Sequence, residues 1–124
     1  MLELLHIENI AVIESADIQF HAGFNALTGE TGAGKSIVID AMGTVLGGRT
    51  SRELVRTGAE KAFVSAAFSA VSANLPGLAE NGVYPDEDGS LLMQREIAND
   101  GKNVCRVNGR PVTVAQLRKI GESL

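Results

Sequence analysis

The sequence has 124 residues, with 44% apolar and 21% charged residues, a formal net charge of −4 and a pI near 5.1. This length suits one hydrophobic core and is too short for two ordinary domains, and the composition is typical of a soluble globular protein. The acidic balance argues against an autonomous nucleic-acid-binding module, although a local basic patch stays compatible with it. The single cysteine, Cys105, excludes an internal disulfide and a four-cysteine zinc site, which favours a reducing cytosol.

The start of the chain predicts neither a signal peptide nor a membrane anchor. Residues 1–6 are interrupted by Glu3 and lack both a basic start and a long apolar centre. No apolar run is long enough to cross a bilayer. We therefore expect a cytoplasmic protein. Neither His6 nor His21 stands in a pattern that implies catalysis.

Two strands are predicted before residue 21. Residues 2–10 mix apolar and polar positions as a strand at a sheet surface does, and residues 16–20 alternate more cleanly and can pair with them. A turn at 21–23 would then lead into a short apolar-leaning strand at 23–28. Antiparallel strands that feed such a strand predict a mixed, partly antiparallel sheet.

Residues 29–36 match the pattern G-x-x-x-x-G-K-[ST] of a phosphate-binding P-loop at every fixed position. Its glycines let the backbone approach a polyphosphate closely, so that successive N–H groups can point at anionic oxygens. Lys35 is expected to contact the β- and γ-phosphates, and Ser36 to ligate Mg²⁺. The predicted nucleotide-binding residues are Gly29, Glu30, Thr31, Gly32, Ala33, Gly34, Lys35 and Ser36.

The context of the loop favours a genuine P-loop over a chance glycine-rich turn. The strand predicted at 23–28 precedes it, and an apolar stretch at 37–46 follows it. Gly47 and Gly48 close that stretch, which is the pattern of a buried helix with a glycine stop. The predicted order of strand, loop and helix is the one that places a phosphate at a helix N-terminus.

Two charged groups beyond the loop are more typical of solvated surface than of a site. Arg49, Arg52 and Arg56 would share one face of a short helix capped by Ser51, and a solvated basic face is favoured there over phosphate or DNA sensing. The acidic run at 86–88 lacks the spacing of a calcium loop, so it predicts a solvated turn.

The second half of the chain predicts strands and a final helix. A strand is expected at 61–69, and residues 74–89 combine a possible short helix with an acidic loop. Strands at 91–97 and 103–107 flank the turn 99–102, a hairpin signal, and Asn108 begins another turn. Thr113, with Gln116 three residues later, predicts a capping box for a helix that runs through Leu117, Ile120 and Leu124.

The sequence lacks the other catalytic parts of a P-loop ATPase. A Walker B strand ends in an acid, and the only near match, residues 37–40, lies in the predicted helix after the loop. Residues 46–49 have a passing likeness to an ABC signature motif, but their position makes them a helix stop. We therefore predict no catalytic residue in this chain.

The whole pattern resembles the SMC-like ABC ATPase heads, and among them the RecN family of bacterial DNA repair proteins. The resemblance covers essentially all 124 residues and is carried by residues 5–14, 29–41, 46–49 and 107–112. Glu30 and Thr31 inside the P-loop, with Ala11 where other SMC-like heads tend to carry a basic residue, are similar to RecN in particular. Departures are small: Ile10 stands where RecN proteins usually have Phe, and Gln94 where a second Arg often precedes Arg95.

This resemblance implies an α/β P-loop NTPase fold, the N-terminal lobe of an ABC/SMC-type head. It implies ATP and Mg²⁺ as cofactors, a second ATPase head as partner, DNA contact through the full-length protein, and recombinational repair of double-strand breaks at the bacterial nucleoid. The chain ends inside a helical pattern, so residues 1–124 are expected to be the N-terminal portion of such a head. The Q-loop, coiled coil, signature motif and Walker B segment would lie beyond Leu124.

Two other functions are compatible with the P-loop. A small nucleoside or metabolite kinase would need an acceptor pocket and an arginine-bearing lid, and the stretch after Gly58 offers no clear one. A non-enzymatic fragment with a vestigial P-loop would not bind ATP with Mg²⁺, so direct binding separates it from the other two.

Overall fold

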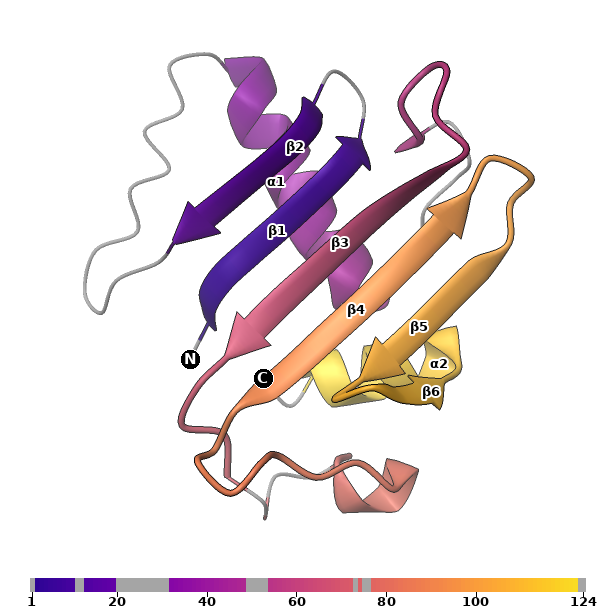
Figure 1. The fold of residues 1–124 in the computed structure, drawn as a ribbon. Helices are drawn as coiled ribbons and strands as arrows, with labels where there is room; N and C mark the ends of the chain where they lie inside the picture. Colours follow the sequence, from indigo (N-terminus) through magenta and orange to yellow (C-terminus); the bar gives the residue numbers. More distant parts are fainter. Residues whose placement is uncertain are drawn as a thin grey trace.

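The structure is a computed structural model that describes residues 2–10, 13–19, 32–48, 54–72, 74 and 77–122, with side chains in the first helix from residue 37 onward. Its described part is a twisted sheet with two α-helices packed on one face, while the other face carries no described helix (Figure 1). The layered arrangement confirms the predicted α/β class.

Six strands form the sheet in the order β2-β1-β3-β4-β5-β6, and every neighbouring pair is antiparallel. The elements are β1 Leu2–Ile10, β2 Ile13–Gln19, α1 Gly32–Val45, β3 Lys61–Phe68, the 3₁₀ helix η2 Ala79–Asn81, β4 Leu91–Ala98, β5 Asn103–Val107, β6 Arg110–Val112 and α2 Val114–Glu122. The strands predicted at 2–10, 61–69, 91–97 and 103–107 are confirmed to within one residue. The strand predicted at 23–28, on which a mixed sheet depends, lies outside the described residues.

The core lies between the sheet and the two helices. Buried and less buried residues alternate along β3 and β4, as expected for strands with one covered face. Each fully buried Leu or Ile contributes about 1.5–3 kcal/mol of burial free energy. The buried residues that join sheet and helices include Leu5, Ile7, Val38, Ala41, Val45, Val64, Met93, Ile97, Leu117 and Ile120.

The predicted hairpin and the predicted turn at Asn108 are confirmed, and the turn leads into the short strand β6, which was not predicted. Gly101, with φ of 92°, lies in the turn between β4 and β5, and Asn108 and Gly109 join β5 to β6 with φ of 50° and 80°. Positive φ at both central residues is the conformation of a type I′ turn, whose twist matches that of the flanking strands. The Asn108 side chain also accepts a hydrogen bond from the Leu92 N–H at 2.7 Å, which ties the second turn back to β4.

The predicted capping box begins α2. The Gln116 N–H donates to Thr113 Oγ1 at 3.1 Å, and the Thr113 N–H donates to Gln116 Oε1 at 2.9 Å. This reciprocal pair satisfies two N–H groups that the helix cannot. Leu117 and Ile120 are then buried on the core side, as their spacing predicted.

An ionisable contact joins β1 to β2 on the outer face of the sheet. His6 lies directly across from Asp17 in the ladder, and its Nδ1 contacts the Asp17 carboxylate while its Nε2 lies 3.3 Å from Glu8 Oε2. The hydrogen bond with Asp17 is the largest cause that raises the pKa of His6 above its ordinary 6.5. Protonated His6 therefore favours the folded state.

This contact predicts that stability falls as the solution becomes more basic. The stabilisation is complete below the unfolded-state pKa of His6, about 6.5, and is lost as the pH rises through the higher folded-state pKa. We expect the urea midpoint to fall across neutral pH, and the fall to be smaller in Asp17→Asn and absent in His6→Gln. Equal pH profiles for the wild type and both variants would contradict this assignment.

Candidate functional site

The predicted P-loop runs into the first turn of α1. The helix begins at Gly32, so residues 32–36 form its N-terminal turn, and the structure describes their backbone. The first N–H groups of a helix have no acceptor within it, and the helix dipole makes this end attractive to anions. Five of the eight predicted nucleotide-binding residues therefore lie where a phosphate can be bound, while Gly29, Glu30 and Thr31 lie outside the described residues.

The rest of α1 holds this turn against the sheet. Val38, Ala41 and Val45 follow a helical spacing and are buried against β1, β3 and β4, over which the helix lies (Figure 1). Asp40 is exposed, and its carbonyl accepts the Thr44 hydroxyl at 2.8 Å. Residues 37–40 are thus helical, which confirms that they cannot serve as a Walker B strand.

Glycine ends α1, as predicted. Gly47 has a φ of 91°, its N–H donates to the Thr44 carbonyl at 3.1 Å, and the Gly48 N–H donates to the Gly43 carbonyl at 2.8 Å. This pair of bonds is the Schellman arrangement, in which a left-handed residue turns the chain away from the helix axis. The helix therefore has a defined end as well as a defined start.

Sequence reasoning missed a buried arginine at that end. Arg95 on β4 is 3% exposed, and its Nη1 donates to the carbonyls of Thr44 and Gly48 at 2.8 and 2.7 Å. Burial lowers the pKa of Arg95, although a guanidinium remains charged in proteins. The sequence did indicate this burial, because alternate residues of a strand lie on the same face and position 95 alternates with the apolar Leu91, Met93 and Ile97.

Of the three arginines after α1, Arg56 lies in the described part of the chain. Arg49 and Arg52 lie outside it. Arg56 is not helical: its N–H donates to the Asn9 carbonyl at 2.8 Å, beside the bridge between Val55 and Ile10. The prediction of one face is therefore wrong at Arg56, because pairing with the end of β1 fixes the backbone there instead of helix periodicity.

The acidic run at 86–88 forms a turn. The Asp86 N–H donates to the Ser90 carbonyl at 2.9 Å, and Asp88 Oδ1 accepts the Ser90 N–H at 3.0 Å. Hydrogen bonding to Ser90 lowers the pKa of Asp88. Within the described residues no three His, Cys, Asp or Glu side chains lie together as metal ligands. The described hydrogen bonds of Asp86 and Asp88 instead form the turn itself.

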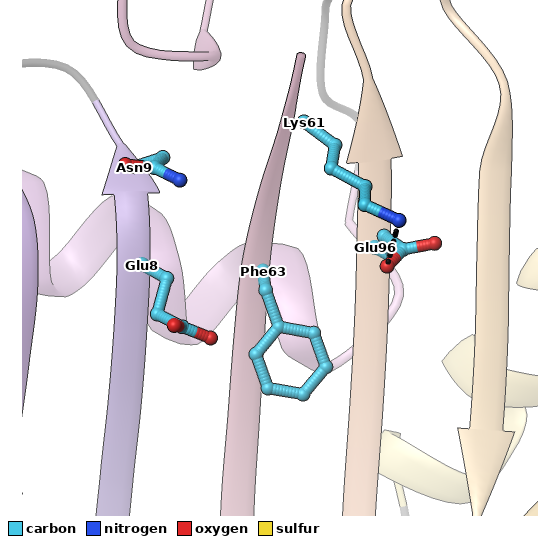
Figure 2. A pocket seen from close by; sticks show the side chains of 5 residues that line it. All are labelled: Glu8, Asn9, Lys61, Phe63 and Glu96. Atoms are coloured by element: carbon cyan, nitrogen blue, oxygen red, sulfur yellow. Dashed lines mark ion pairs between the residues drawn. The ribbon is translucent and has the colours of Figure 1, made fainter. Parts of the chain in front are cut away.

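A hollow of about 240 Å³ lies on the outer face of the sheet, away from α1. Glu8, Asn9, Lys61, Phe63 and Glu96 line it, and Lys61 Nζ is 3.2 Å from Glu96 Oε1 (Figure 2). Because the hollow and α1 lie on opposite faces of the sheet, the hollow is separate from the predicted phosphate site. Among the described helices, none is long and apolar enough to cross a membrane.

Comparison with known proteins identifies the family. The profile of the AAA domain family matches residues 4–113. The DNA repair protein RecN of Bacillus subtilis is 48% identical over 126 residues, and RecN of Halalkalibacterium halodurans is 45% identical over 127 residues. Each alignment covers 100% of this chain and 22% of the relative, so the chain spans about a fifth of the length of these relatives.

Solved structures agree with this match. A structure described as "Structural biochemistry of ATP-driven dimerization and DNA stimulated activation of SMC ATPases" superposes with a TM-score of 0.80 and 26% identity over 98% of this chain and 78% of that chain. An Smc head domain from Pyrococcus furiosus with an extended coiled coil has a TM-score of 0.76 at 24% identity over 98% of this chain and 32% of that chain, which shows the shared fold.

The family and the local geometry lead to the same conclusion. Membership of the AAA domain family implies nucleotide binding, and the chain places its P-loop sequence at the N-terminus of α1 as such binding requires. The likeness to RecN extends over the whole chain and the fold is that of SMC heads. We conclude that the chain belongs to the AAA domain family and corresponds to the N-terminal head region of RecN-type proteins.

Proposed function

We propose that this chain is the ATP-binding part of a RecN-like ATPase that acts in recombinational repair of DNA double-strand breaks. The observation that carries the proposal is the P-loop sequence whose last five residues form the first turn of α1. Backbone N–H groups of residues 29–36 would surround the phosphates, and Lys35 would neutralise the β- and γ-phosphate oxygens. The Ser36 hydroxyl would ligate a Mg²⁺ ion that bridges the same oxygens.

The partners follow from the same proposal. A second ATPase head would close over the nucleotide, and DNA would be bound through the complete protein in the bacterial cytoplasm. The relatives named for DNA repair, and the SMC structure whose description mentions ATP-driven dimerization and DNA-stimulated activation, support these assignments. A kinase is disfavoured, because the family match and the head fold account for the chain from residue 4 to residue 113 without an acceptor site.

A test in cells compares two lysines in the complete RecN-like protein. Lys35→Ala is expected to remove resistance to agents that break both DNA strands. Lys61→Ala is the matched control, because Lys61 is 57% exposed and lies on the outer face of the sheet, paired with Glu96. Full resistance in the Lys35 variant, or equal loss in both variants, would contradict the proposal.

The chain by itself is expected to bind ATP without turning it over. Phosphoryl transfer needs a group that orients the attacking water and further charge around the γ-phosphate. The sequence of residues 1–124 contains no Walker B motif whose acid could orient the water. In a phosphate-release assay, with and without DNA, the purified chain should not exceed the rate of Lys35→Ala, which measures contaminating activity. Robust turnover that depends on Lys35 would show that catalytic groups are present in this chain.

A further inference from the structure

The C-terminal end of α1 is held by arginines from two later elements. Arg95 on β4 donates from Nη1 to the carbonyls of Thr44 and Gly48, and Arg118 on α2 donates from Nε to the Gly47 carbonyl at 3.1 Å. The last carbonyls of a helix have no N–H partner within it, and positive charge at this end complements the helix dipole. The two side chains therefore bind the last turn of α1, at Thr44, and the two glycines that follow the helix.

Arg95 is itself fixed in one orientation. Its Nε donates to Asn103 Oδ1 on the neighbouring strand β5 at 3.0 Å, so the guanidinium contacts β5 at one side and α1 at the other. A charge that is 3% exposed is strongly disfavoured unless its hydrogen bonds are made. Any displacement of the end of α1 relative to β4 would break these bonds, which makes the position of that end well defined.

The packing around this end leaves no room for the helix to slide. A Cβ added at Gly47 would lie 2.5 Å from the Arg118 Cα, and one added at Gly121 would lie 2.7 Å from the Leu46 carbonyl oxygen. These approaches bring the backbone of α2 directly against the end of α1. The end of α1 is thus enclosed by β4 on one side and α2 on another.

The opposite end of the same helix carries the P-loop residues. With 14 residues, α1 is about 20 Å long, and its backbone hydrogen bonds connect its two ends without a break in the helix. A tilt at its C-terminus would therefore re-aim the N–H groups of its first turn. We propose that Arg95 is a positioning residue for nucleotide binding, because it fixes the orientation of the turn that binds phosphate. This inference rests on the proposed function, since it concerns the same phosphate site.

The test measures the affinity of the chain for MgATP by calorimetry and, without nucleotide, the hydrogen exchange of the α1 amides. Arg95→Met, which keeps an unbranched stem and removes the guanidinium donors, is expected to lose affinity about tenfold and to exchange faster in residues 32–36. Arg95→Lys keeps the charge and should recover part of the affinity. Asn103→Ala removes the acceptor for Nε and a bond to the Gly101 carbonyl but leaves both bonds from Arg95 to α1, so it should lose less affinity than Arg95→Met.

Val107→Ala controls for general destabilisation. Val107 is buried in β5, which is not among the strands that α1 mainly contacts, so this variant lowers stability without removing a hydrogen bond to the end of the helix. It should keep wild-type affinity when measured below its unfolding transition. Equal losses in Val107→Ala and Arg95→Met, or wild-type affinity in all Arg95 and Asn103 variants, would overturn the positioning role.

The exchange measurement separates this inference from the proposed function. If the wild-type chain does not bind MgATP, the proposed function fails, while faster exchange in the first turn of Arg95→Met would still support positional control by Arg95. If binding is present and depends on Lys35 but the Arg95 variants match the wild type in both measurements, the proposed function stands and the inference is wrong. Should Arg95→Met not fold, Arg95→Lys and Asn103→Ala decide by the same criteria.

Discussion

Replacing Lys35 by alanine is expected to weaken MgATP binding to this chain on the order of a hundredfold, because a charge-assisted contact to the β- and γ-phosphates is lost. Lys35 is the only lysine that the P-loop pattern places on the phosphates, and it lies in the first turn of α1. The fold should change little, since residues 37–45 of the same helix supply the buried contacts that the structure describes for it. Isothermal titration calorimetry gives the affinity, and urea denaturation gives the stability.

Lys61→Ala is the matched control for this measurement. It removes the same charge from an exposed position on β3, where Lys61 pairs with Glu96 at 3.2 Å. Surface ion pairs contribute little to stability, so both affinity and fold should stay near the wild type. Unchanged ATP affinity in Lys35→Ala would remove the basis for assigning the phosphate site to this loop.

The largest expected effect on stability comes from Gly47→Ala. Gly47 has a φ of 91°, which disfavours a side chain, and an added Cβ would lie 2.5 Å from the Arg118 Cα. Backbone strain and overpacking together should lower the free energy of unfolding by about 2–4 kcal/mol. Urea denaturation followed by circular dichroism measures this change.

Gly43→Ala is the control within the same helix. Gly43 is exposed, lies before the helix end, and has open space within 4 Å of an added Cβ. Alanine favours a helix interior over glycine by about 0.5–1 kcal/mol, so this variant should be slightly more stable than the wild type. A similar stability for Gly47→Ala and Gly43→Ala would show that the end of α1 is not enclosed as described.

Much of the fold could be predicted because it is determined by local chemistry. The Asn108-Gly109 turn, the Thr113 and Gln116 capping box and the glycine stop at Gly47 each depend on a few neighbouring residues with distinct backbone or hydrogen-bonding preferences. The alternation in β3 and β4 likewise records which face of each strand is covered. Such features are present in the sequence before any tertiary contact forms.

The features that sequence reasoning missed depend on contacts between distant segments. Arg95 and Thr44 are 51 residues apart, and an arginine in a sequence is ordinarily expected at the surface. Arg56 was assigned to a helix face from spacing, whereas pairing next to Asn9 fixes its backbone. The strand alternation indicates that position 95 is buried but not that Arg95 contacts α1, and no local pattern indicates that Arg56 pairs next to the end of β1.

The candidate site was more predictable than its support. The P-loop pattern identified residues 29–36, and the structure places residues 32–36 in the first turn of α1. The pattern does not indicate what holds the other end of that helix. The residues that do so, Arg95 and Arg118, lie in elements far along the sequence from α1. The candidate phosphate site is thus a local sequence pattern, whereas the contacts that hold the other end of its helix come from distant segments.

The most direct test of nucleotide binding at the N-terminus of α1 is an amide chemical-shift map of the ¹⁵N-labelled chain titrated with MgATP. We expect the largest shifts in residues 32–36 and little change around the outer hollow at Glu8, Phe63 and Glu96. The same shifts should be lost in Lys35→Ala. Shifts centred on the outer hollow, or none at saturating MgATP, would contradict the assignment of the nucleotide site to this helix.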